Sequence, residues 1–205
     1  MRRLVTAITT VALVAAMAGT AGANTWETTD LSGQGGGGTV SVDGVRINRS
    51  ATGVTASITM PTPQPGSYSY PPSAMFPTSS GVAGHPEAFS LWVIVFFNPD
   101  ACDGACDMPD VTTNPNVVAG GYNGGGHMAA GPKLTLSGRV NAESATFGGP
   151  NAESIAQALA DGYSFADAHI HIAVAPHGAL APELLPQQIT TPAGTPAYWW
   201  LGIFA

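Results

Sequence analysis

Residues 89 to 97, FSLWVIVFF, form an apolar run that is rich in β-branched and aromatic side chains. A run with no polar face predicts a strand that is buried on both sides. The dipeptide Asn98-Pro99 follows the run and is a turn signal. We therefore expect a central strand here, with the rest of the chain folded around it.

Other short strands are expected on both sides of this run, because Gly, Pro, Thr, Ser and Val are abundant and only 9% of the residues are charged. Asp43-Gly44 has the preferred chemistry of a two-residue hairpin turn between strands at 39–42 and 45–48. One helix is predicted over 152–160, with Asn151 as N-cap and Gly162 as its stop. The remaining expected elements are strands at 54–60, 117–119, 133–140, 168–175 and 198–204, a glycine-rich turn at 122–126, and proline-rich segments at 61–86 and 176–196.

Eight or so short strands separated by turn signals indicate a single antiparallel β-sandwich with one short helix and long Pro- and Gly-rich loops. Residues 24–38 are polar and end in four glycines, so they are expected to form a flexible lead. The β-sandwich domain is then expected to cover residues 39–205, which is enough chain for one core.

Residues 1–23 have the three parts of a secretory signal peptide: a basic start, an apolar run, and a small-residue site at 21–23. Cleavage near Ala23 predicts a secreted or periplasmic protein, and no other stretch is long and apolar enough to span a bilayer. Without Arg2 and Arg3, four of the six basic residues remain against thirteen acidic ones. This balance argues against nucleic acid as a partner, because phosphate binding needs basic patches.

The two cysteines, Cys102 and Cys106, are expected to form a disulfide, because an exported chain meets an oxidising compartment. Four carboxylates crowd about this small loop and could bind calcium through oxygen. The favoured alternative is a solvated loop in which aspartates cap turns. The possible calcium ligands are Asp100, Asp103, Asp107 and Asp110.

Three histidines lie in AHIHIAVAPHG, residues 168 to 178. Alternation along a strand projects His169 and His171 from the same face, and His177 follows where Pro176 should end regular pairing. Three imidazoles can hold zinc or copper and leave a position for water. The alternative places His169 and His171 on a solvated face, with the others hydrogen-bonded to loops. The candidate metal ligands are His171, His177, His127 and His169, with His85 as a further outside candidate.

Five aromatic residues could form platforms that stack against sugars, although core packing is the favoured interpretation for most of them. Adjacent tryptophans on a strand must face opposite sides, so one of Trp199 and Trp200 is expected in the core and the other is a candidate for exposure. The five residues are Tyr68, Tyr70, Tyr198, Trp199 and Trp200.

The AHIH at residues 168 to 171 resembles the signature of the chordin-type (CHRD) domain, a β-sandwich of exported proteins. The order of short motifs over about half of the mature chain is also similar to a group of uncharacterised bacterial exported proteins. These motifs are Gly84-His85, residues 91–99, the two cysteines, Gly126-His127, and His171 with His177-Gly178. The resemblance implies a CHRD-like or superoxide-dismutase-like sandwich. It singles out His171 and His177 with His127 as their companion, which leaves His169 the most dispensable of the four.

Two functions follow from these observations. The preferred one is an extracytoplasmic binding or structural module for an unknown ligand. The alternative is a copper or zinc protein, or a metal-dependent enzyme, centred on the four histidines. No nucleophile elbow, HExxH helix or P-loop occurs in the sequence, so a non-enzymatic role is favoured. Convergence of three imidazole nitrogens within about 4 Å of one another would distinguish the two.

Overall fold

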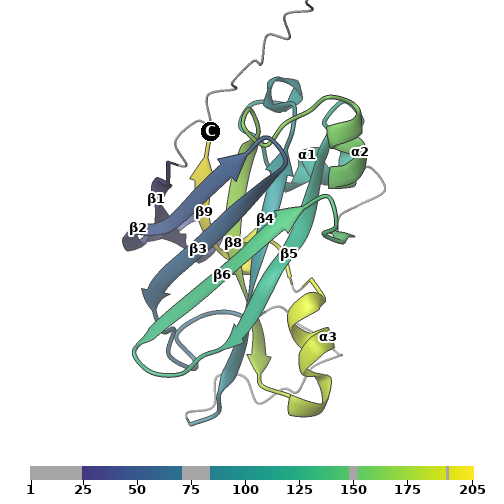
Figure 1. Cartoon of the computed structure of the whole chain (residues 1–205). Coiled ribbons are helices and arrows are strands. Elements are labelled where there is room, and N and C mark those ends of the chain that lie inside the picture. Colours follow the sequence, from purple (N-terminus) through teal and green to yellow (C-terminus); the bar gives the residue numbers. More distant parts are fainter. Residues whose placement is uncertain (1–24, 71–83, 148–151, 193) are drawn as a thin grey trace, which may run out of the picture.

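The computed structural model describes residues 25–70, 84–147, 152–192 and 194–205. Nine strands of the described residues form one curled sheet, in the order β6-β3-β2-β1-β9-β8-β4-β5-β7, and every strand pair in it is antiparallel (Figure 1). The predicted antiparallel β class is confirmed. The strands are β1 (Glu27–Gly33), β2 (Gly37–Ser50), β3 (Gly53–Pro61), β4 (Glu87–Phe96), β5 (Ala119–Met128), β6 (Lys133–Asn141), β7 (Thr146–Phe147), β8 (His169–Ala179) and β9 (Trp200–Phe204).

Strand β4 contains most of the apolar run and lies between β8 and β5, as its sequence predicted. All ten of its residues are buried. Phe89, Leu91, Val93 and Val95 belong to the larger of two hydrophobic clusters, on one face of β4. The other face carries Trp92, Ile94 and Phe96, which belong to a second, smaller cluster. We refer to these as the first and second cores.

The sheet curls so that its edge strand β6 lies beside β5 (Figure 1). Glycines make this approach possible: a Cβ on Gly138 of β6 would collide with the Gly124 carbonyl oxygen of β5, and a Cβ on Gly124 would collide with Leu91. The glycine-rich turn predicted at 122–126 is therefore wrong, because these residues lie within β5. Their glycines serve close packing instead of chain reversal.

The two halves of the sheet are joined by a narrow link. Strands β1 and β9 share a single registered pair, Ser32 with Leu201. On either side of this link, the longer ladders hold β6, β3, β2 and β1 together, and β9, β8, β4 and β5 together. The first core draws residues from both halves, so it lies inside the curl.

Residues 27–33 were predicted to belong to a flexible lead, and this is wrong: they form β1, between β2 and β9. Leu31 is fully buried there. The polar residues that suggested flexibility alternate with buried positions, so the strand needs only a few apolar side chains to hold it in the sheet.

Asp43-Gly44 is not a hairpin turn, because β2 continues through it from Gly37 to Ser50. The register with β1 shifts between the pairs Thr29–Val45 and Leu31–Ser41, which makes this point a β-bulge. Asp43 has a positive φ of 49°, and its N–H donates to a carboxylate oxygen of Asp30. The left-handed conformation that suits a hairpin turn also suits a bulge, so the dipeptide did not distinguish them.

Three short α-helices are present in the described residues instead of the one predicted. The predicted helix is α2, but its N-cap is Ser154, whose side chain accepts from the Gln157 N–H, whereas Asn151 lies outside the described residues. The other two helices each contain proline in their first turn and span only six residues, in segments that were predicted as loops. The helices are α1 (Met108–Thr113), α2 (Ile155–Ala160) and α3 (Leu185–Thr190), with single 3-10 turns η1 (Gln34–Gly36), η2 (Pro99–Ala101), η3 (Pro182–Leu184) and η4 (Pro196–Tyr198).

No helix in the described part of the chain is long and apolar enough to cross a membrane. The predicted signal peptide, residues 1–23, lies outside the described residues. The same holds for residues 71–83 of the proline-rich segment.

Replacing Gly138 with alanine tests the close approach of β6 to β5. The added methyl group would have to push the two backbones apart, so we expect the free energy of unfolding to fall by about 1–3 kcal/mol or more. Urea denaturation followed by tryptophan fluorescence measures this change. Gly38→Ala is the control, because that glycine is exposed and a Cβ there would meet nothing within 4 Å. An equal effect of both substitutions would contradict the proposed packing role.

Candidate functional site

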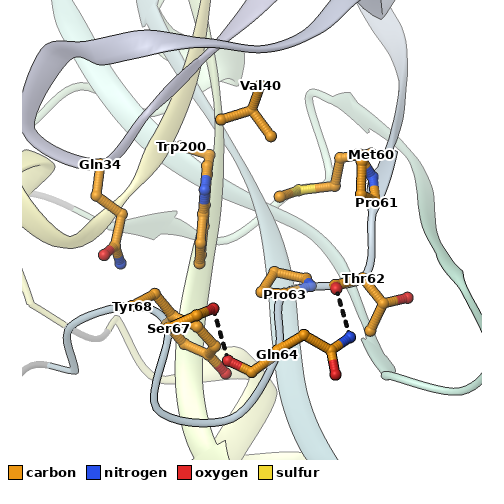
Figure 2. A pocket seen from close by; sticks show the side chains of 10 residues that line it. All are labelled: Gln34, Val40, Met60, Pro61, Thr62, Pro63, Gln64, Ser67, Tyr68 and Trp200. Atoms are coloured by element: carbon orange, nitrogen blue, oxygen red, sulfur yellow. Dashed lines mark hydrogen bonds between the residues drawn. The ribbon is translucent and has the colours of Figure 1, made fainter.

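A groove of about 400 Å³ lies between η1, the end of β3 with the loop that follows it, and β9 (Figure 2). Figure 2 shows the Trp200 ring standing between Gln34 on one side and Met60 and Pro63 on the other, with Tyr68 below it. None of the described residues that line this groove is charged. We call it the Trp200 groove; its lining is Gln34, Val40, residues 60–64, Ser67, Tyr68 and Trp200.

An aromatic cluster forms the floor of the groove. The Tyr68 ring centroid lies 4.5 Å from that of Tyr70, 5.2 Å from that of Trp200 and 5.8 Å from that of Phe89. Trp200 is 5% exposed and Trp199 is 3% exposed, in the first and second cores respectively. The two tryptophans face opposite sides, as alternation predicted, but neither is exposed, because both faces of this part of the sheet are covered.

Two residues of the groove lining carry a buried side-chain oxygen, Oγ1 of Thr62 and the phenolic oxygen of Tyr68, that has no hydrogen-bond partner among the described residues. A buried hydroxyl without a partner costs about 1–3 kcal/mol. The side-chain amide of Gln34, in contrast, has hydrogen-bond partners on both its nitrogen and its oxygen. Its nitrogen donates to the carbonyl oxygens of Ser69 and Tyr198, and its oxygen accepts from the Ser69 N–H. Gln34 thus holds the wall of the groove in place.

Two histidines, His169 and His171, lie on the face of β8 that packs against the second core. The Nε2 atoms of His169 and His171 are 2.9 Å apart, and both rings pack against Phe96, with centroid distances of 5.9 Å and 5.1 Å. His171 is 7% exposed, and His169 is partly exposed. His171 also lines a small cavity of about 70 Å³ together with Met108 of α1. One of the two interpretations left this face in solvent, and it is wrong for His171, because the second core packs on this face.

The pair is uncharged at neutral pH. Burial, together with the neighbouring His169, lowers the pKa of His171 to about 4. Burial and the charge of Arg49 lower the pKa of His169 from its ordinary value. Two neutral imidazoles at this distance share one N–H between their Nε2 atoms, and each is available as a nitrogen ligand once that proton moves.

His177 lies near the opposite end of β8 in a buried chain of hydrogen bonds. Its Nε2 is 2.6 Å from Ser90 Oγ, and Ser90 Oγ accepts from the Trp92 indole N–H at 2.7 Å. Ser90 is fully buried and His177 is 4% exposed. Burial lowers the pKa of His177 to about 4. A serine beside a histidine is the geometry of an activated nucleophile, but the burial of both favours a structural role that joins β4 to β8.

The structure does not place the predicted ligands around one point. His171 and His177 are six residues apart on β8, roughly 20 Å at strand spacing. His127 lies opposite Phe89, so its side chain is on the face of the first core, whereas His177 contacts Ser90 on the other face. His127 and His85 are both exposed. Among the described residues, no group of three or more His, Cys, Asp or Glu side chains could hold a metal ion.

The histidines that do meet are His169 and His171. The sequence ranked His169 as the most dispensable of the four, because the resemblance to exported proteins did not include it. The strict alternation in β8 was the better signal, since it places residues i and i+2 on one face. Met108, which lines the cavity beside His171, was missed because its segment was predicted as a loop.

The aspartates near the cysteines act mainly as caps. Asp107 accepts from the Asp110 N–H at the start of α1, and Asp110 accepts from the N–H groups of Asp103 and Asp107 and from the Asn114 amide. Burial alone would raise the pKa of the Asp110 carboxyl, but these hydrogen bonds outweigh it and hold the pKa below its ordinary value. The favoured interpretation, that aspartates cap turns, fits both residues. Asp100 lies in η2 and, like Asp103, is exposed. The sulfur atoms of Cys102 and Cys106 lie 2.08 Å apart, at disulfide distance as predicted.

The burial of His171 and His177 predicts that the free energy of unfolding depends on pH. Their pKa is near 4 in the folded state and about 6.5 in the unfolded chain, so between these values the unfolded state binds more protons. The free energy of unfolding should be fully present above about pH 6.5 and fall by on the order of 3 kcal/mol per imidazole as the pH approaches 4. Urea denaturation at a series of pH values measures this slope.

His177→Gln should remove about half of that slope, whatever it does to stability at pH 7. His127→Gln, at an exposed position, is the control for losing a histidine as such. A wild-type unfolding free energy that stays constant between pH 6.5 and 4 would contradict the burial of these rings.

In comparisons with known proteins, no family model, no curated protein and no solved structure matches the chain. The resemblances to the CHRD domain and to bacterial exported proteins therefore stay predictions.

Proposed function

We propose that this chain is an extracytoplasmic binding module of β-sandwich architecture that binds a neutral saccharide in the Trp200 groove. The observation that carries this proposal is the pair of buried hydroxyls of Thr62 and Tyr68, which belong to residues of the groove lining and have no hydrogen-bond partner among the described residues. Both oxygens are closed to solvent, so the loop after β3 has to shift before the hydroxyl groups of a ligand can pair with them; each hydroxyl can then donate and accept.

The chemistry of the groove lining supports an uncharged ligand that has both flat apolar faces and hydroxyl groups. The rings of Trp200 and Tyr68, with Met60 and Pro63, supply apolar surface, and the described part of the lining contains no charged side chain. Binding sites of this kind combine apolar walls with a few polar groups that fix orientation. Saccharide units match that combination, whereas nucleotides and acidic ligands would leave their charges unpaired in this groove.

The compartment and the architecture are supported separately. The signal-type sequence of residues 1–23 and the cysteine pair at disulfide distance support an extracytoplasmic location. A sandwich, CHRD-like or superoxide-dismutase-like, is supported by the single registered pair between β1 and β9. The two halves of the curled sheet could then act as two layers on either side of the first core.

Two conservative substitutions test the groove. Tyr68→Phe and Thr62→Val each remove an unpaired hydroxyl at nearly constant volume, so the free protein should be as stable as the wild type or more stable. The same substitutions should weaken saccharide binding by about 5- to 100-fold, because the ligand loses a buried partner. A variant that binds less and unfolds no more easily is the expected signature of a ligand-directed hydroxyl.

The measurement is an NMR titration of the full chain with glucose, galactose, mannose, N-acetylglucosamine and their β-linked dimers. Saturable shifts are expected at the Trp200 indole and the Thr62 amide. Tyr163→Phe is the matched control, because that ring packs at the edge of the first core and away from the groove. Absence of saturable shifts with every sugar would overturn the proposal. So would a Tyr68→Phe variant that is clearly destabilised, since that would mean the hydroxyl already has a partner.

A further inference from the structure

We propose that His169 and His171, together with the Met108 thioether, form a copper(I) site. The site lies on the face of the second core, whereas Trp200 pairs with Val174 on the face of the first core. It is therefore separate from the Trp200 groove and does not depend on the function proposed there.

The distance between the two imidazoles is the first observation. Two imidazole nitrogens that bind one ion at about 2.0 Å lie roughly 3 to 3.5 Å apart. The Nε2 atoms of His169 and His171 lie 2.9 Å apart, so a small outward rotation of one ring would admit an ion in place of the shared N–H. The donating ring would then carry its proton on Nδ1, and binding would release no net proton.

The cavity beside the pair is the second observation. His171 and Met108 line the same space of about 70 Å³, which is large enough for an ion. Its other walls are mainly apolar, formed by Ile94, Pro196, Trp199 and Leu201, and the one charged residue in its lining is Asp107. Such walls keep water away from a bound ion and favour its lower oxidation state. Partial exposure of His169 leaves a route from solvent to the pair.

The charge of the surroundings selects the ion. Arg49 lies beside the pair, because its Nη1 donates to the carbonyl oxygen of Ala168 at 2.7 Å, and its charge is balanced by a two-pronged ion pair with Glu27 at 2.7 Å and 2.8 Å. Asp107 lines the same cavity, but among the described residues no hydrogen bond or ion pair joins a carboxylate to either imidazole. A neutral donor set in such surroundings suits a monovalent ion better than a divalent one. The soft thioether of Met108 favours copper(I) over zinc.

The test is an anaerobic titration of the purified full chain with copper(I) in competition with the chelator bicinchoninate, and a parallel titration with zinc(II). We expect about one equivalent of copper(I) to be retained and zinc(II) to bind more weakly. X-ray absorption of the loaded protein should show two nitrogen neighbours and one sulfur neighbour. No net proton release should accompany binding in weakly buffered solution.

Variants identify the ligands. His169→Gln and His171→Gln should each weaken copper(I) binding by at least about tenfold. Met108→Leu should do the same while keeping the volume of the side chain, so it separates loss of a ligand from loss of the fold. His127→Gln is the control and should bind as the wild type does. Failure of the wild type to compete with the chelator, an unchanged affinity of Met108→Leu, or tighter zinc than copper binding would each overturn the proposal.

Discussion

The burial of β4 on both faces is the constraint on which the rest of this structure depends. A strand whose ten residues are all buried cannot lie on a surface, so chain must cover it from two sides. The first core covers one face inside the curl of the sheet, and the second core covers the other under α1, the cysteine loop and Trp199. Each candidate site stands at one of these covered faces. The Phe89 ring packs against Tyr68 in the floor of the Trp200 groove, and the Phe96 ring packs against the imidazoles of His169 and His171.

The curl of the sheet depends on two glycines, because they have no side chain to keep the strands apart. Strand β6 can lie beside β5 only because Gly138 and Gly124 bring two backbones together, and the first core is closed by that approach. Hydrophobic burial supplies the driving force, and the glycines remove the steric obstacle to it. The buried hydroxyls of Thr62 and Tyr68 lie in the loop after β3, which Gln34 holds through two hydrogen bonds to Ser69.

Much of the fold could be predicted from local pattern. The central strand, the strands that became β3, β6, β8 and β9, and the helix at 155–160 all carry periodicity or end signals that are legible over a few residues. Errors arose where one local signal suits two structures. The glycines of β5 and the bulge at Asp43-Gly44 were taken for turns, because glycine reports backbone freedom or close packing and does not say which. The polar strand β1 and the two proline-containing helices had too little apolar pattern of their own, so contacts with the rest of the molecule decide them.

The sequence by itself determined the β class, the strand that must be central, the cysteine pair and the same-face placement of His169 and His171. These are consequences of composition and of the two-residue period of a strand, which act within a few residues. Only the tertiary structure decided which distant residues meet. It separated His177 and His127 on opposite faces of the sheet, brought Met108 to the cavity beside His171, and gathered Gln34, Thr62, Tyr68 and Trp200 around one groove. Strand order and register set those distances, and they follow from the packing of the whole core, which no short segment encodes.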